Sequence, residues 1–327
     1  MTQSLERTQA DVRVARLKAI PWTNYVVYIG FVLVFVFFAI TQTSYFLTST
    51  NLTNIVVQAA PITIMAIGTV FMLSLGEIDL SIGSIVALSA LSAALILEST
   101  QQWWIGALAG LATGAIVGFV NGVFVTYVRL PSFLVTLATM GLVTGIARQL
   151  TNLQSVPVHD NIFVWIFGGG KLLSVSILIW WTVVIVLVGW HLLSQRRFGA
   201  HVLAIGNSVN AARVSGIILN RVKMTVFIIS GTAAGLAGIL YDGRLGGARY
   251  SLGDADLMSV LAAVIIGGTA LMGGKGSIIG ALVGSLLMSM INNGLILAGL
   301  NVSQQMIVRG IIILVAVSLS LRGKKSQ

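Results

Sequence analysis

The chain has 327 residues, of which 57% are hydrophobic and only 9% are charged. Soluble domains carry about 25% charged residues, and no soluble fold of this length has enough interior to bury so much apolar surface. A bilayer solvates such a surface, so the composition indicates an integral membrane protein. The chain has no cysteine and three scattered histidines, which excludes disulfides and thiolate sites and argues against a histidine metal cluster.

Ten apolar runs approach the length of about 20 residues that a helix needs to cross the hydrocarbon core. They cover residues 22–41, 54–75, 81–98, 103–126, 132–150, 173–193, 224–241, 256–273, 277–298 and 304–321. The first run is too long for a cleaved signal peptide and predicts a retained membrane helix. The second and third are the weakest, because the polar stretch Gly76–Ser81 between them can lie at membrane depth. The sequence therefore predicts an all-α, polytopic membrane bundle of about ten transmembrane helices in one domain, residues 22–321.

Lysine and arginine favour one side of this predicted topology. With the N-terminus inside, inside segments hold fourteen of the nineteen basic residues, as the positive-inside rule describes. The five on the outside are Arg148, Lys171, Arg244, Arg249 and Arg309. Residues 1–21 and 322–327 are therefore expected in the cytoplasm. The net charge of +10 is spread over short segments that flank apolar runs, which argues against a nucleic-acid partner.

Two parts of the chain show an internal repeat. Glycines recur every fourth residue in the fourth and ninth spans, at Gly106, Gly110, Gly114, Gly118 and Gly122 and at Gly276, Gly280 and Gly284. Such faces let helix backbones touch. These spans also end alike, in Asn121-Gly122 and Asn293-Gly294, and the spans before them open at Asp79 and Asp256. A shift of five spans reverses the direction of crossing, so we expect an inverted repeat, as transporters have.

Polar residues within or beside the spans are candidates for a translocation path, because ionisable groups at membrane depth usually face a cavity. The candidates are Glu77, Asp79, Ser81, Asn121, Asn292, Asn293 and Gln304. An alternative structural role is open for each type. A carboxylate such as Asp79 or Asp256 caps free amides at a helix start, and buried amide side chains commonly bond between helices.

The longest inside segment, residues 194–223, contains a short helix with recognisable ends. Asn207 or Ser208 caps it and Gly216 ends it. A helix of about two turns is unstable alone, and small residues on it suit docking into a groove on a partner. The candidate coupling residues are Gly199, Gly206, Asn207, Ser208, Ala211, Ala212 and Gly216. The alternative is an ordinary basic loop.

Four stretches of the chain resemble the ribose-type permeases, the membrane subunits of bacterial ATP-binding-cassette importers for sugars. They are Gly76–Ser84, Ala204–Ile217, Ala263–Ser277, and Asn292–Leu295 followed by Gln304–Val308. The first is similar to the family's Gly-Gly-Ile-Asp-Leu-Ser-Val-Gly-Ser signature and the second to its segment that contacts the ATPase. Glu77 replaces a glycine of that signature, and Gly253–Leu257 differs from the usual Gly-Tyr-Glu-Leu-Asp type.

The resemblance implies a non-enzymatic permease of the bacterial inner membrane that imports a monosaccharide or sugar alcohol. It implies three partners: a second permease subunit, identical or different, a cytoplasmic ATPase, and an external sugar-binding protein. ATP and magnesium would bind to the ATPase and no cofactor to this chain, which has no Gly-x-x-x-x-Gly-Lys-Ser/Thr loop. The alternatives are a branched-chain amino-acid permease and an ion-coupled carrier; an intramembrane enzyme lacks a catalytic grouping.

Overall fold

The computed structural model describes residues 26–322, so the expected cytoplasmic segment 1–21 and residues 323–327 of the expected tail lie outside it. The long helices are α2 (Val26–Thr41), α4 (Ser49–Leu75), α5 (Ile82–Thr100), α6 (Trp103–Thr126), α7 (Ser132–Thr151), α9 (Ile177–Trp190), α10 (Arg197–Asn207), α12 (Leu219–Leu245), α13 (Asp256–Ile266), α14 (Ile278–Leu297) and α15 (Val302–Arg322). The short helices are α3 (Thr43–Phe46), α8 (Asn161–Val164) and α11 (Val209–Val214), with π-helical turns η2 (Trp165–Gly169) and η3 (His191–Gln195).

Each of the ten expected spans coincides at least in part with a helix. Seven helices in the described part of the chain are long and apolar enough to cross a membrane: α4, α5, α6, α7, α9 with η3, α12 and α14. The chain is therefore a polytopic helical membrane protein. Its only strands among residues 26–322 are two short antiparallel pairs, β1 (Val156–Pro157) with β4 (Gly247–Ala248) and β2 (Lys171–Leu172) with β3 (Val175–Ser176).

The span expected over residues 256–273 is shorter than predicted. Its helix, α13, has 11 residues, which is about 16 Å at 1.5 Å per residue and about half of a hydrocarbon core of roughly 30 Å. Glycine, which disfavours helix, recurs through the next eleven residues, and three of these glycines, Gly268, Gly273 and Gly274, have positive φ. An apolar run cannot reveal this end, because glycine counts as neutral in hydropathy.

Gly76 ends α4 in the left-handed region, with φ +87°. Its N–H donates to Leu73 and the N–H of Glu77 donates to Met72, each at 3.0 Å. This is the usual way for a glycine to close a helix, because the next two amides satisfy carbonyls of the last turn. The polar stretch Gly76–Ser81 therefore separates α4 from α5 inside the bundle, as the sequence allowed.

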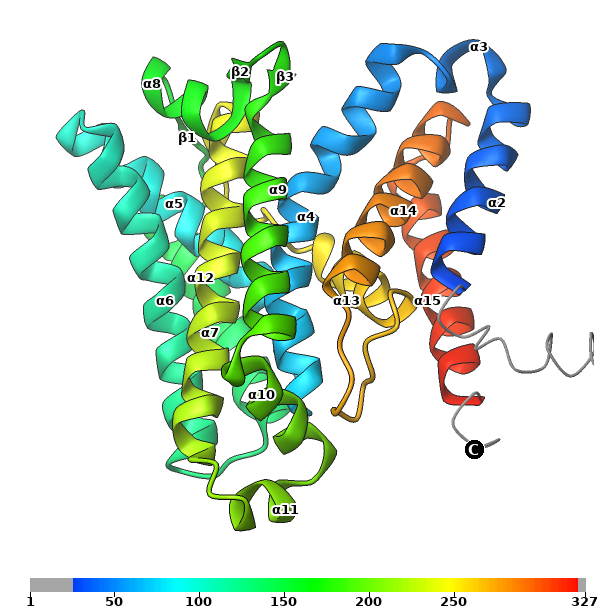
Figure 1. Cartoon of the computed structure of the whole chain (residues 1–327). Coiled ribbons are helices and arrows are strands. Elements are labelled where there is room, and N and C mark those ends of the chain that lie inside the picture. Colours follow the sequence, from blue (N-terminus) through cyan, green and yellow to red (C-terminus); the bar gives the residue numbers. More distant parts are fainter. Residues whose placement is uncertain (1–25, 323–327) are drawn as a thin grey trace, which may run out of the picture.

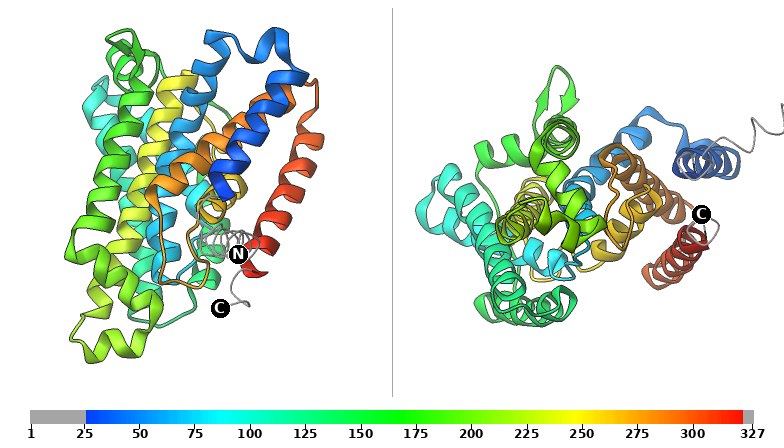
Figure 2. Two further views of the ribbon diagram at one scale, coloured as in Figure 1. Left: turned by 45° about the vertical axis from the view of Figure 1, so that its right-hand side comes forward. Right: turned by 60° about the horizontal axis from the view of Figure 1, so that its bottom comes forward.

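The two helices of 27 residues, α4 and α12, form the centre of the bundle. They pack on each other; α12 also packs on α5 and α6, and α4 also packs on α13 and α14. Figures 1 and 2 show α6 and α7 on one side of this centre and α2, α14 and α15 on the other. Helices α10 and α11 lie at one end of the bundle, and α8 with β2 and β3 lies at the opposite end (Figure 1).

The glycine faces predicted to lie in helix contacts are confirmed. A Cβ at Gly114 would overlap the carbonyl oxygen of Gly231 in α12, and one at Gly280 would overlap the carbonyl oxygen of Gly267 beside α13. Both obstacles are backbone atoms, which do not move aside as a side-chain tip does. Here the helices touch backbone to backbone, which is how helices associate where lipid removes the hydrophobic drive between them.

We predict that Gly114→Leu prevents formation of a stable bundle, because four added carbons meet the backbone of α12. Gly145→Leu is the matched control, since no atom lies within 4 Å of a Cβ at this glycine of α7. The measurement is the size-exclusion profile of each variant in detergent. A monodisperse peak for both variants would show that the α6–α12 contact tolerates separation.

Candidate functional site

Asp79 is the centre of a buried polar network at the break between α4 and α5. The side chain is 3% exposed. Its Oδ1 accepts hydrogen bonds from the N–H of Ser81 at 2.9 Å and from the hydroxyl of Ser81 at 2.6 Å. Its Oδ2 accepts from the hydroxyl of Ser230 in α12 at 3.0 Å. The carboxylate therefore fixes the turn that leads into α5 through the N-cap residue Ser81, without capping an amide of the helix itself, and it also ties this turn to the central helix.

The network continues from Ser81 into α6 and α7. The side-chain amide of Asn121 donates to the Ser81 hydroxyl at 3.0 Å, and the hydroxyl of Thr139 donates to Asn121 Oδ1 at 2.6 Å. Three of the predicted path residues, Asp79, Ser81 and Asn121, are thus brought together. Ser230 and Thr139 were missed, because serine and threonine are common in membrane helices and nothing in the sequence distinguishes these two.

Hydroxyl groups of α7 satisfy the backbone of the same break. Ser132 Oγ accepts from the N–H of Ile78 at 3.1 Å, and Thr136 Oγ1 accepts from the N–H of Leu80 at 3.1 Å. Without these contacts the two amides would be unpaired inside a membrane protein, at a cost of several kcal/mol. Helix α7 therefore fixes the conformation of the break.

Glu77, the residue that departs from the family signature, forms a salt bridge with Lys223 in the first turns of α12. The side chains are 14% and 22% exposed, respectively. This pair neutralises the additional charge close to the end of the bundle that carries α10 and α11. Glu77 is therefore adjacent to the Asp79 network but pairs outside it.

The remaining predicted path residues lie elsewhere. The amides of Asn293 and Asn51 bond reciprocally, at 2.8 and 3.1 Å, and join α14 to the first turn of α4. Asn292 Oδ1 is buried without a hydrogen-bond partner. Gln304 is exposed and exchanges two hydrogen bonds with Asn301, which form a capping box at the start of α15. Asn293 thus has the interhelical role given as the alternative, and Gln304 has a local one.

The coupling segment contains the short helix that the sequence predicted, with the predicted ends. Ser208 Oγ accepts from the N–H of Ala211 at 3.3 Å at the start of α11, and Gly216 follows the helix with φ +81°. Ala211 is exposed and Val214 is 90% exposed. Ala212, in contrast, is buried against the chain itself, so it does not belong to the exposed face of α11.

A second helix in this segment, α10, was not expected, and it packs on α4. Its Gly206 lies so close to Ser74 and Gly274 that a Cβ would overlap their backbone atoms. The N–H of Gly274 also donates to the Ser74 carbonyl at 2.9 Å. The end of α10 therefore contacts both the last turn of α4 and the glycine-rich link between α13 and α14. Gly199 is also required by packing, because a Cβ there would overlap the Leu193 backbone.

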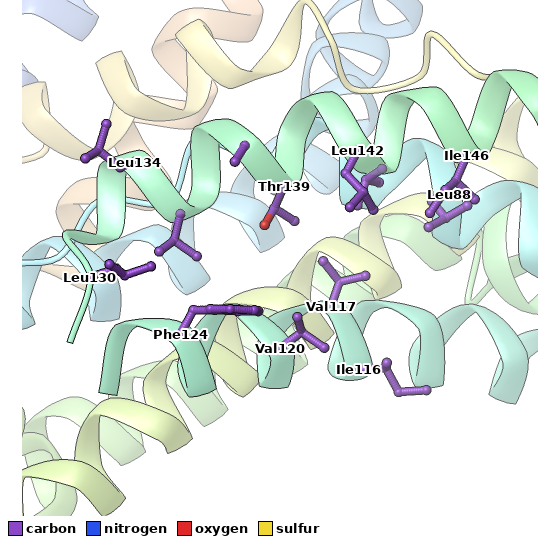
Figure 3. Close-up of a pocket in the computed structure, with 13 residues that line it drawn as sticks. Leu88, Ile116, Val117, Val120, Phe124, Leu130, Leu134, Thr139, Leu142 and Ile146 are labelled. Carbon is purple, nitrogen blue, oxygen red and sulfur yellow. The ribbon is translucent and has the colours of Figure 1, made fainter. Parts of the chain in front are cut away.

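A groove of about 480 Å³ lies between α6 and α7 (Figure 3). Its walls include Phe124, Leu134 and Leu142, and Thr139 is the one polar residue among those that line it. The groove offers too few donors and acceptors for a polar solute. In the described part of the chain no group of three or more His, Asp or Glu residues is placed to hold a metal ion.

Residues 51–317 match the model of the family described as "Branched-chain amino acid transport system / permease component". The chain belongs to this permease family. The ribose import permease protein RbsC of Escherichia coli strain K12 is 38% identical over 276 residues, which cover 83% of this chain and 86% of the relative. The L-arabinose permease AraH of Azospirillum brasilense is 36% identical, with 83% and 80% covered.

The D-allose permease AlsC of Escherichia coli K12 is 32% identical and covers 92% of both chains. No solved structure matches significantly. Permeases are transport subunits and not enzymes, and with its membrane-spanning helices this permease is a multi-pass inner-membrane protein.

We predict that Asp79→Ala destabilises the bundle by about 3 kcal/mol, because three donors lose their acceptor in a buried site. Asp242→Ala in α12 is the matched control: Asp242 is also fully buried, but neither of its carboxylate oxygens has a hydrogen-bond partner. The measurement is the apparent melting temperature of each variant in detergent. Equal shifts for both variants would contradict the role of the Asp79 network.

Proposed function

We propose that this permease is the membrane-spanning subunit of an ATP-driven importer for a monosaccharide or sugar alcohol. The observation that carries the proposal is its similarity, over more than four-fifths of its length, to relatives named for ribose, L-arabinose and D-allose. Any ATP and magnesium are bound by a separate cytoplasmic ATPase. An external binding protein delivers the sugar, and a second permease subunit completes the complex.

The proposed topology has ten spans, an inverted repeat and both termini in the cytoplasm. Its support is the reciprocal packing of the two halves. The 27-residue helix α4 of the first half packs on α13 and α14, and its counterpart α12 packs on α5 and α6. Each long helix ends at a left-handed glycine, Gly76 or Gly246. The corresponding helices α6 and α14 both carry a glycine face: that of α6 contacts α12, and that of α14 contacts the end of α13.

Energy enters the permease through α11 in this proposal. The ATPase binds the exposed face that includes Ala211 and Val214, and its movement is passed to α10. Through Gly206, α10 displaces Ser74 and Gly274 together. Ser74 adjoins the break at Gly76–Ser81, and Gly274 lies in the glycine-rich link between α13 and α14, so one cytoplasmic displacement reaches both halves. Different sugar affinities of the resulting states then drive transport.

An ion-coupled carrier remains the second candidate, and Asp242 is the observation that favours it. A buried carboxyl without a partner is typical of proton relays in membrane transporters. A branched-chain amino-acid importer is a third candidate from the family description.

We predict that proteoliposomes with this permease, its ATPase and its binding protein import at least one of the three sugars ribose, arabinose and allose. Import is expected to require ATP on the side of the membrane that carries the ATPase. Uptake of the radiolabelled sugars and of leucine is measured with and without ATP, and with a proton ionophore. If the ionophore abolishes uptake and ATP does not support it, the protein is the ion-coupled carrier. Uptake of leucine alone would identify the amino-acid importer.

We predict that Ala211→Glu prevents binding of the ATPase, because a carboxylate on the docking face must be desolvated in the partner's groove. The control is Gln154→Glu, which places the same charge on an exposed residue at the opposite end of the bundle. Co-purification of the ATPase and sugar-stimulated ATP hydrolysis are measured for both. Normal co-purification and transport with Ala211→Glu would contradict the docking role and the proposed orientation of α11.

A further inference from the structure

A second polar cluster lies beside the Asp79 network, where α12, α13 and α15 meet: a Cβ at Gly83, two residues beyond Ser81, would contact the backbone of Gly253 and Asp254. The hydroxyl of Tyr241 in α12 donates to Asp256 Oδ2 at 2.6 Å. Arg244 lies three residues beyond Tyr241, about one turn along α12, and Arg309 belongs to α15, which packs on α13; both carry positive charges toward this carboxylate. The segment before α13 extends the cluster toward α7, because Arg148 interacts with the charge of Asp254 and lies 5.3 Å from the ring centroid of Tyr250.

The charges of this cluster are close to one another but do not form ion pairs. Among the described residues, the one salt bridge within 4.0 Å is that between Lys223 and Glu77. Arg309 Nε is buried and has no hydrogen-bond partner, while Asp256 accepts from the neutral Tyr241. Arg309 therefore keeps a free donor within this cluster, which a polar solute can satisfy.

The position of the cluster excludes lipid as its neighbour. Figure 1 shows α13, which begins at Asp256, about midway between the two ends of the bundle. Arg309 is seven residues into α15, about 10 Å along the helix. Asp254 is exposed, and Asp256, Arg244 and Arg309 are partly exposed. Asp256 and Arg309 lie in helices α13 and α15, and partly exposed charged groups at such a depth face a polar cavity and not hydrocarbon.

We infer that Asp256, Arg244 and Arg309 form a contact site for a neutral, hydroxyl-rich solute, and that Tyr241 positions the Asp256 carboxylate. The inference rests on the proposed sugar import and names the residues at which the sugar is held in passage. A carboxylate accepts hydrogen bonds from sugar hydroxyls, and a guanidinium donates to hydroxyl and ring oxygens. The start of a half-length helix adds free amides beside the carboxylate.

Cysteine labelling tests whether water and solute reach this site, since the chain has no native cysteine. Arg309→Cys is treated with a charged, membrane-impermeant maleimide in right-side-out membrane vesicles that contain the complete importer. Leu187→Cys is the control, because this residue is 57% exposed among the apolar residues of α9. We expect labelling of Arg309→Cys to be faster than that of Leu187→Cys by at least about tenfold. We also expect the imported sugar to slow it.

Equal labelling rates for the two variants would overturn the inference, because the cluster would then be dry. Where Arg309→Cys fails to give a monodisperse protein, Arg244→Cys replaces it with the same expected results. Slowing by leucine and not by ribose, arabinose or allose would overturn the assignment of a hydroxyl-rich solute.

Sugar selectivity separates a contact role from a structural one. Asp256→Asn keeps an acceptor for Tyr241 but loses the charge and one acceptor for the solute. We expect the ratio of ribose, arabinose and allose uptake to change by about fivefold, the effect of one hydrogen bond. An equal decrease for all three sugars would show a structural role. If the unmodified permease imports none of them, the proposed function fails, while the labelling rate still reports whether the cluster is hydrated.

Discussion

A backbone amide that leaves a helix inside a membrane bundle must find another partner, and this constraint determines how the centre of the permease is built. The break at Gly76–Ser81 is satisfied by Asp79 and by two hydroxyl groups of α7. At the second break, Gly274 donates to Ser74 at the end of α4. Each break therefore depends on a helix or link that is distant in the sequence, and the helices around the breaks are held in register by them.

Close backbone contacts are the second consequence of building breaks into the centre. Partners such as Ser230 and Asn121 have short side chains, so the helices that carry them must approach closely to reach Ser81 and Asp79. The glycine contacts of α6 with α12 allow this approach. A larger residue at Gly118 would separate α6 from α12, and Asn121 lies less than one turn from it. Packing and hydrogen bonding are therefore two aspects of one arrangement.

Features that depend on local chemistry could be predicted from the sequence. The helix closed by Gly76, the cap at Ser208 and the glycine faces follow from residue type and spacing, and the structure confirms them. Features that depend on contacts between distant parts of the chain could not be predicted in this way. Ser230, a partner of Asp79, is 151 residues away from it, and Asn121 reaches Ser81 across 40 residues. Tyr241 meets Asp256 across a loop with no recognisable motif.

Two differences between the expected and the observed structure have the same physical origin. Hydropathy measures how well a segment tolerates lipid, and it does not measure whether the segment is helical, so the glycine-rich residues after Ile266 were assigned to a span. Likewise, a short helix with two adjacent alanines does not show which of them faces its own chain. Only packing decides that Ala212 is buried and Ala211 exposed.

The contact of α10 with Ser74 and Gly274 shows how a small helix at one end can act on the whole bundle. Gly206 touches Ser74 and Gly274 through backbone atoms, and these two are hydrogen-bonded to each other. Side-chain contacts absorb a displacement by changing rotamer, but backbone contacts between glycines have no such freedom. Packed interfaces of this kind move between discrete arrangements and do not deform continuously. A shift of α10 must therefore displace the end of α4 and the link to α14 together.

The Asp79 network begins five residues beyond Ser74, and the Asp256 cluster begins at the far end of the half-length helix that precedes Gly274. In the proposed coupling, the Asp79 network and the Asp256 cluster are thus each joined by one stretch of chain to an element that α10 contacts.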